Sequence, residues 1–227
     1  MRRYFPIGAT AVALSASLLT ACGDISISFG DDVSKAKGNG KPATETRAVA
    51  AFTAIEATGI GRLKLLVGEA DSLKISADEN ILPLIKSEVK DGVLVLSTTG
   101  ATRSKTDIIF EATAKTIKRL ENSGTVSINA SGFNGGDLSV ATSGVGSIAL
   151  SGRVDSLKVE LSGVGSLEAD ELTADRVTTN LSGVGSAAVR AQKSIHGSVS
   201  GIGSLTWKGT ATEVSTNVSG IGRVSKG

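Results

Sequence analysis

The chain has 227 residues with 24 basic and 22 acidic side chains, and it combines 28 glycines with only 3% aromatic residues. A formal net charge of +2 gives no basic excess, so we do not expect nucleic-acid binding. A single cysteine excludes an intramolecular disulfide, and a core with so few large side chains must consist of Val, Ile, Leu and Ala.

The first 21 residues have the features of a signal peptide. Arg2 and Arg3 form a basic start, residues 7–19 are mostly apolar, and small residues precede Cys22. The apolar stretch is too short to span a bilayer comfortably. Residues 1–21 are therefore predicted to be a lipoprotein signal peptide. Its removal takes away two basic residues and no acidic ones, which leaves the rest of the chain electrically neutral.

Cys22 is the predicted site of membrane attachment. It follows Leu19-Thr20-Ala21, and the four residues together resemble the lipobox of bacterial lipoproteins. In that family the cysteine receives lipid and becomes the mature N-terminus, and more than one acyl chain makes the attachment stable. Gly23 rather than Asp follows the cysteine, which by the same resemblance favours the outer membrane. The alternative is an ordinary buried thiol.

The chain after Cys22 divides into a tether and a domain. Residues 22–46 are polar and aperiodic, and they are predicted to be a lipidated flexible tether. Residues 47–227 form the domain, whose first part, residues 47–120, is irregular. In that part, residues 78–85 suggest one short helix, residues 89–96 suggest two strands around an Asp-Gly turn, and residues 98–107 suggest a polar loop. We expect this part to cap the repeats that follow.

A repeat of about 19 residues fills residues 121–227. Ser143-Gly144-Val145-Gly146-Ser147 returns with its first serine at positions 162, 182, 200 and 219, at steps of 19, 20, 18 and 19 residues. An early relative begins at Thr58 and a degenerate one at Ser123. The repeat-motif glycines are Gly144, Gly146, Gly163, Gly165, Gly183, Gly185, Gly201, Gly203, Gly220 and Gly222.

Apolar residues around each motif recur at every second position, as in Leu157, Val159 and Leu161 before Gly163. This alternation is typical of strands with one buried side. A unit of 19 residues cannot bury its own apolar side, so successive units must stack. The predicted fold is all-β: a right-handed parallel β-helix, or β-solenoid, with coils rising about 4.8 Å. The glycines indicate a tight corner, or a place without room for Cβ.

Five further apolar residues occupy the middle of the motif: Val145, Val164, Val184, Ile202 and Ile221. We call them the Val/Ile ladder. If the strand runs straight through the motif, the ladder faces outward as an apolar ridge. If the glycines bend the chain, these side chains turn inward and join the core. The second arrangement is the one that we expect.

Taken together, these segments resemble a known family. Phe52-Thr53-Ala54-Ile55, the segments 78–85 and 89–96 and the Ser-Gly-Val-Gly-Ser repeats are similar to the putative auto-transporter adhesin head domain of GIN type, over about residues 47–223. The resemblance implies a β-helical fold in envelope lipoproteins. It implies neither an established ligand nor catalytic residues.

The sequence offers few candidates for catalysis. His196, the only histidine, is expected to face solvent, Trp207 to pack in the core or at its end, and residues 134–137 to form a turn. With no His/Cys cluster, no metal and no cofactor are predicted. Acid/base chemistry on polysaccharides would need carboxylates gathered on one face. The acids Asp155, Glu160, Glu168, Asp170, Asp175 and Glu213 are spread out and often stand near Lys or Arg, which is typical of a solvated surface.

The sequence therefore favours a non-catalytic function: a lipid-anchored envelope protein that acts as an adhesin or surface interaction scaffold. Its partners would be the membrane, through Cys22, and a glycan or protein ligand of unknown identity. Two alternatives are a small polysaccharide-acting lyase or hydrolase, and a purely structural spacer. Converging carboxylates would favour the first, and an outward Val/Ile ladder would favour a protein partner or self-association.

Overall fold

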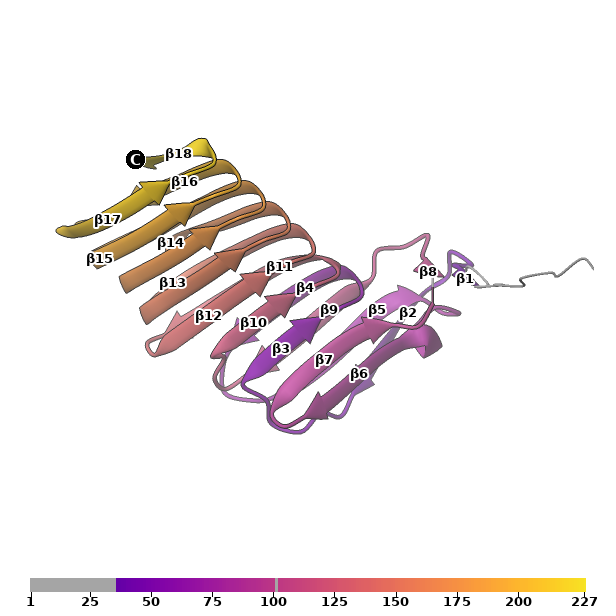
Figure 1. Ribbon diagram of the computed structural model, residues 1–227. Helices are drawn as coiled ribbons and strands as arrows, with labels where there is room; N and C mark the ends of the chain where they lie inside the picture. The colour runs from indigo at the N-terminus through magenta and orange to yellow at the C-terminus, as the bar shows by residue number, and fades with distance from the viewer. Residues whose placement is uncertain (1–35, 101) are drawn as a thin grey trace, which may run out of the picture. The chain divides into compact units, whose positions relative to one another are not determined.

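The computed structural model describes residues 36–100 and 102–227, and nearly all of this part of the chain is β-structure. The predicted signal peptide, Cys22 and the predicted tether up to residue 35 lie outside the described residues. Strands wind into flattened coils that stack in parallel, so the predicted all-β parallel solenoid is confirmed (Figure 1).

Each coil contributes one strand segment to each of two facing layers. The leading layer contains the segments that precede the Ser-Gly corners, and Figure 1 shows it as a row of parallel arrows from β7 to β17. In stacking order its strands are β7 (Val93–Thr98), β3 (Ala54–Ala57), β10 (Arg119–Asn122), β12 (Asp137–Thr142), the second parts of β13 (Val145–Leu161), β14 (Val164–Leu181) and β15 (Val184–Val199), and β17 (Glu213–Val218).

The trailing layer contains the segments that follow the corners, and it also pairs in parallel. Its order is β9 (Ile109–Ala114), β4 (Ile60–Val67), β11 (Thr125–Asn134), the first parts of β13, β14 and β15, then β16 (Ile202–Lys208) and β18 (Ile221–Lys226). Because β13, β14 and β15 continue from this layer into the leading layer of the next coil, the second corner of each of these coils is a bend within one strand.

The core lies between the two layers and consists of the alternate residues predicted to face inward. Leu157 and Val159 of the leading layer and Ile148 and Leu167 of the trailing layer are all at most 1% exposed. Removing each such side chain from water contributes about 1.5–3 kcal/mol. Equivalent motif residues stack in register, since Val145 pairs with Val164 and Val164 with Val184. The 19-residue repeat is thus one coil of the solenoid.

The N-terminal part closes one end of the stack with antiparallel strands. On the trailing layer, β5 (Ser72–Asp78) pairs antiparallel with β9, and β2 (Pro42–Arg47) pairs antiparallel with β5. On the leading layer, β6 (Ile85–Lys90) forms a hairpin with β7 through Asp91 and Gly92, which confirms the predicted Asp-Gly turn. These strands cover the edges of the first coil, as expected for a cap.

The short helix expected over residues 78–85 is reduced to one turn. Asp78 is the last residue of β5, and a 3-10 turn at Leu82–Leu84 leads directly into β6. The apolar residues Ile81, Leu82 and Ile85 are buried, but Ile85 already pairs with Thr98 in the hairpin. Pairing with β7 therefore ends the helical geometry after one turn.

The expected tether is also shorter than predicted, because residues 36–46 already belong to the fold. The short strand β1 (Ala36–Lys37) pairs with β8 (Thr102–Arg103) inside the expected polar loop, and β2 pairs along its whole length with β5. Arg47 at the end of β2 donates to the carbonyl oxygens of Ile85 at 2.7 Å and Leu82 at 3.0 Å. Since β2 has no apolar alternation, its sequence gives no strand signal.

Candidate interaction surface

The Ser-Gly-Val-Gly-Ser motifs form one long edge of the solenoid, which we call the glycine edge. In the coil that contains Ser162, the backbone N–H groups of Ser162 and Gly163 donate to the carbonyl oxygen of Thr142 at 2.8 and 3.1 Å. The N–H of Val164 donates to the carbonyl oxygen of Gly144 at 3.0 Å. The other corners repeat this pattern, so each corner satisfies its backbone donors on the coil before it.

All ten repeat-motif glycines lie on this edge in two columns, and neither column has room for a side chain. A Cβ on Gly163, Gly183, Gly201 or Gly220 would overlap the carbonyl oxygen of the equivalent glycine in the preceding coil. The same holds for Gly165, Gly185, Gly203 and Gly222. A Cβ on Gly144 would overlap the carbonyl oxygen of Gly124, and one on Gly146 would overlap that of Val126. Close stacking of backbone on backbone is thus the physical reason for these residues.

The expectation that the Val/Ile ladder joins the core is wrong. Val145, Val164, Val184, Ile202 and Ile221 are exposed by 50, 53, 49, 54 and 76%. The chain turns at the Ser-Gly pair, so the strand resumes at the Val or Ile with its side chain pointing outward. The space behind the corner holds Leu161, Leu181 and Val199, and only about 10 Å³ remains there. A second apolar side chain does not fit inside.

Strand register extends this ridge toward the N-terminal cap. Val145 pairs with Thr125, and Thr125 pairs with Ile60, which is itself 45% exposed. Between Arg62 and Arg223 the five-residue corner motifs contain no charged side chain. The glycine edge is therefore an uncharged strip of Ser, Gly and Val/Ile columns, with Ser on both sides of the ridge. An apolar row of this kind is a typical feature of an interaction surface.

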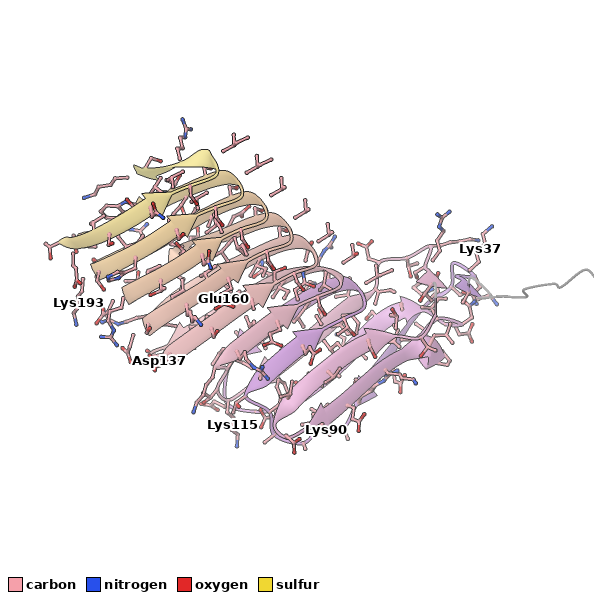
Figure 2. All side chains as sticks on the ribbon, in the orientation of Figure 1. Lys37, Lys90, Lys115, Asp137, Glu160 and Lys193 are labelled. Carbon is pink, nitrogen blue, oxygen red and sulfur yellow. The ribbon has the colours of Figure 1, made fainter. Side chains whose placement is uncertain are left out.

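The opposite edge of the solenoid has a different character. There, Asp175 forms ion pairs with Lys193 at 2.8 Å and with Arg153 at 3.2 Å. Figure 2 shows Lys193, Asp137 and Lys115 along this edge, away from the Ser-Gly corners. These charged side chains lie at the opposite edge, whereas the corner motifs of the glycine edge between those of Arg62 and Arg223 are uncharged.

The six acids considered in the sequence do not assemble into one catalytic group. Glu160 pairs with Lys158 at 2.8 Å, Asp155 accepts from the N–H of Gly136 at 2.9 Å, and Glu213 stands 3.7 Å from His196. Hydrogen bonds from Lys208 and Lys193 lower the pKa values of Asp170 and Asp175, respectively, against a smaller opposing effect of burial. A general acid needs the reverse shift.

Three acids do share one shallow depression on the trailing layer. Glu168, Asp170 and Glu171 line a space of about 220 Å³ where β13 and β14 shift in register. Asp170 is bound there by Lys208 at 2.9 Å. Within the described residues no group of three or more His, Cys, Asp or Glu side chains is arranged to hold a metal ion.

The remaining single residues lie as expected. His196 is exposed on the leading layer, and residues 134–137 form a turn between β11 and β12. Trp207 is 6% exposed at the C-terminal end of the stack, where the ammonium group of Lys226 lies 4.7 Å from its ring centre. In the part of the chain that the structure covers, no helix is long and apolar enough to cross a membrane.

A buried carboxylate, which the sequence did not single out, organises the loop that contains β8. Asp78 is fully buried and accepts hydrogen bonds from the Ser104 hydroxyl at 3.0 Å, the Lys105 N–H at 2.7 Å and the Thr106 hydroxyl at 2.9 Å. Burial raises the pKa of the Asp78 carboxyl, but these hydrogen bonds together lower it further, so that its pKa lies below the ordinary value of 3.8. The loop is thereby fixed by an ionised group.

This arrangement predicts a pH-dependent contribution to stability. Because the pKa of Asp78 is lowered in the folded state, its stabilisation is fully present above the ordinary value of 3.8 and is lost as the pH falls below it. We expect Asp78→Asn to unfold more easily than the wild type at about pH 7, and the difference to narrow below pH 3.8. Chemical unfolding followed by circular dichroism, at about pH 7 and below pH 3.8, measures the difference in free energy of unfolding between the two proteins. A difference that does not change with pH would contradict the prediction.

Comparison with known proteins gives one family and several similar folds. The family model described as "Putative auto-transporter adhesin, head GIN domain" matches residues 51–211. A crystal structure of a putative adhesin from Bacteroides fragilis superposes with a TM-score of 0.68 at 25% identity, covering 84% of this chain and 99% of that one. A putative adhesin from Parabacteroides merdae gives a TM-score of 0.50 at 22% identity, with coverages of 85% and 99%. Among curated proteins no match is found.

Proposed function

Since the chain belongs to the family of putative auto-transporter adhesin head GIN domains, we propose that it is a non-catalytic, lipid-anchored protein of the cell envelope that binds a partner protein along the glycine edge. Cys22 would hold it at the membrane, most simply the outer membrane given Gly23. The observation that carries this proposal is the exposed Val/Ile ladder.

The composition of the glycine edge specifies the chemistry of the partner. An apolar row flanked by hydroxyls and backbone, with no charged side chain in the corner motifs between those of Arg62 and Arg223, disfavours a strongly charged polymer. It suits an apolar row on a protein surface, which loses water on contact and meets no unpaired charge. The rungs repeat at about the strand spacing of 4.8 Å, so an extended partner segment can contact several coils at once.

Two substitutions on the ladder test the proposal. We expect the double variant Val164→Glu and Val184→Glu to remain folded, because both side chains are about half exposed, and to lose at least about tenfold in affinity for a protein ligand. The full chain, purified in detergent, is first screened against extracellular and envelope proteins and glycans, with turnover of each glycan recorded in the same wells. The affinities of wild type and variant are then compared by surface plasmon resonance.

A matched control places glutamate on the leading layer of the coil that contains Val184. Thr178 is exposed on the leading layer, and Thr178→Glu is expected to leave the affinity unchanged. Equal binding by the ladder variant and the wild type would contradict the assignment of the glycine edge. Cleavage of a glycan would overturn the non-catalytic function and direct attention to Glu168, Asp170 and Glu171. If the screen detects neither binding nor glycan turnover, the result would favour a structural spacer.

A further inference from the structure

A second candidate site lies at the N-terminal end of the glycine edge. A pocket of about 340 Å³ opens between the loop that contains β8 and the first two corners of the solenoid. Its charged side chains are Arg62, Arg103 and Asp107. The rest of the lining includes hydroxyl-bearing residues of the loop and of β11, among them Thr102, Thr125 and Ser127, and the apolar residues Ile60 and Ile108. This volume lies at the small end of the range for ligand pockets and is suited to one sugar-sized ring.

The loop that forms one side of the pocket is held from behind. The three hydrogen bonds to Asp78 fix residues 104–106, and β1 pairs with β8 along the same loop. The N–H of Gly38 also donates to the carbonyl oxygen of Arg103 at 2.8 Å. Because residues 104–106 are already held, little further conformational entropy is lost there when a ligand binds, which favours affinity.

The two guanidinium groups indicate the charge of the ligand. Arg62 forms an ion pair with Asp107 at 3.4 Å, but both side chains are more than half exposed, so this pair contributes little and is easily exchanged. Among the described residues no carboxylate lies within ion-pair distance of Arg103. Planar guanidinium groups bind carboxylates and phosphates by paired hydrogen bonds.

We propose that this pocket binds an acidic sugar residue, that is, a hydroxyl-rich ring with a carboxylate or phosphate group. Arg103 and Arg62 hold the anionic group, and the hydroxyls of Thr102, Thr125 and Ser127 face the ring. The site is separate from the contact proposed for the Val/Ile ladder and does not depend on it. It gives the protein a means of recognising a glycan at the end of its protein-binding edge.

Binding of small probes tests the proposal directly. The full chain in detergent is titrated by calorimetry with galacturonic acid, galactose 6-phosphate, galactose and inorganic phosphate. We expect at least one acidic sugar to bind about tenfold or more tightly than galactose, and Arg103→Gln to weaken that binding about tenfold. Arg223→Gln is the control for loss of an arginine outside the pocket: Arg223 occupies in the last coil the corner position that Arg62 occupies in the first. It is expected to bind as the wild type does.

A third variant reverses the sign of the effect. Asp107→Asn frees Arg62 and removes a competing carboxylate, so we expect it to bind the acidic sugar more tightly than the wild type. Equal affinity for galactose and both acids, no binding of any probe, or unchanged binding by Arg103→Gln would overturn the proposal. Inorganic phosphate binding as tightly as the sugars would overturn its sugar part. The two acidic probes distinguish a carboxylate from a phosphate ligand, and loss of this site leaves the ladder experiment unaffected.

Discussion

Replacing Gly183 by alanine is expected to destabilise the solenoid by at least about 3 kcal/mol. The new Cβ would overlap the Gly163 carbonyl oxygen, which accepts a hydrogen bond from the N–H of Val184 at 3.0 Å. The two coils would have to separate at that point, which weakens this hydrogen bond and its neighbours on the same corner. Because the contact is with backbone on both sides, no side chain can move aside to relieve it.

A second glycine separates lack of space from backbone strain. Gly136 has φ +79° in a turn, and a Cβ there would have no atom within 4 Å. Gly136→Ala is therefore expected to cost only about 1–2 kcal/mol, the penalty of a left-handed backbone conformation. Urea unfolding of both variants and the wild type gives the two differences. A cost for Gly183→Ala no larger than that for Gly136→Ala would show that the corner opens freely.

These glycines illustrate how far the sequence predicts the fold. Five motifs at steps of 18 to 20 residues, in phase with alternating apolar residues, imply stacked coils because no other arrangement buries every repeat equally. The register follows from the motif itself, and the structure pairs glycine with glycine and Val with Val along the trailing layer. Regular repetition therefore determines the regular part of the molecule.

The same pattern could not determine which way the Val/Ile ladder faces. A strict period of two places Val164 on the opposite side from Leu167, but a bend at the glycines could have restored it to the core. The outcome depends on the width of the coil at the corner, which Leu161 and Leu181 already fill from inside. That width is a property of stacked backbones, and one coil's sequence does not contain it.

The irregular N-terminal part escaped prediction for another reason. Strand β2 is recognised by its pairing with β5 and by the hydrogen bonds of Arg47, which are contacts between segments distant in sequence. Asp78 opens the segment 78–85, which the sequence predicts to be a short helix because acids often stand at helix starts. Its actual partners are Ser104, Lys105 and Thr106, which lie more than 25 residues away in the sequence. The same loop forms one wall of the pocket that contains Arg62 and Arg103.

Truncating a core leucine is the second substitution with a large expected effect. Leu157 is fully buried in the leading layer, where it stacks on Leu138 of the preceding coil and Val177 of the next. Leu157→Ala removes apolar contacts on both sides and leaves a cavity, because the hydrogen-bonded coils above and below cannot collapse into it. We expect a loss of about 2–5 kcal/mol in the free energy of unfolding.

Val164→Ala is the matched control for this prediction, since it lies only seven residues further along the chain, on the Val/Ile ladder, with its side chain 53% exposed. Its expected effect is within about 0.5 kcal/mol of zero, as for other surface positions. Denaturant unfolding of both variants and the wild type therefore compares the free-energy cost of truncating an inward-facing and an outward-facing side chain. If Val164→Ala were as costly as Leu157→Ala, the ladder would contribute to folding as a core does. That result would contradict the proposal that the glycine edge is a surface available to a partner.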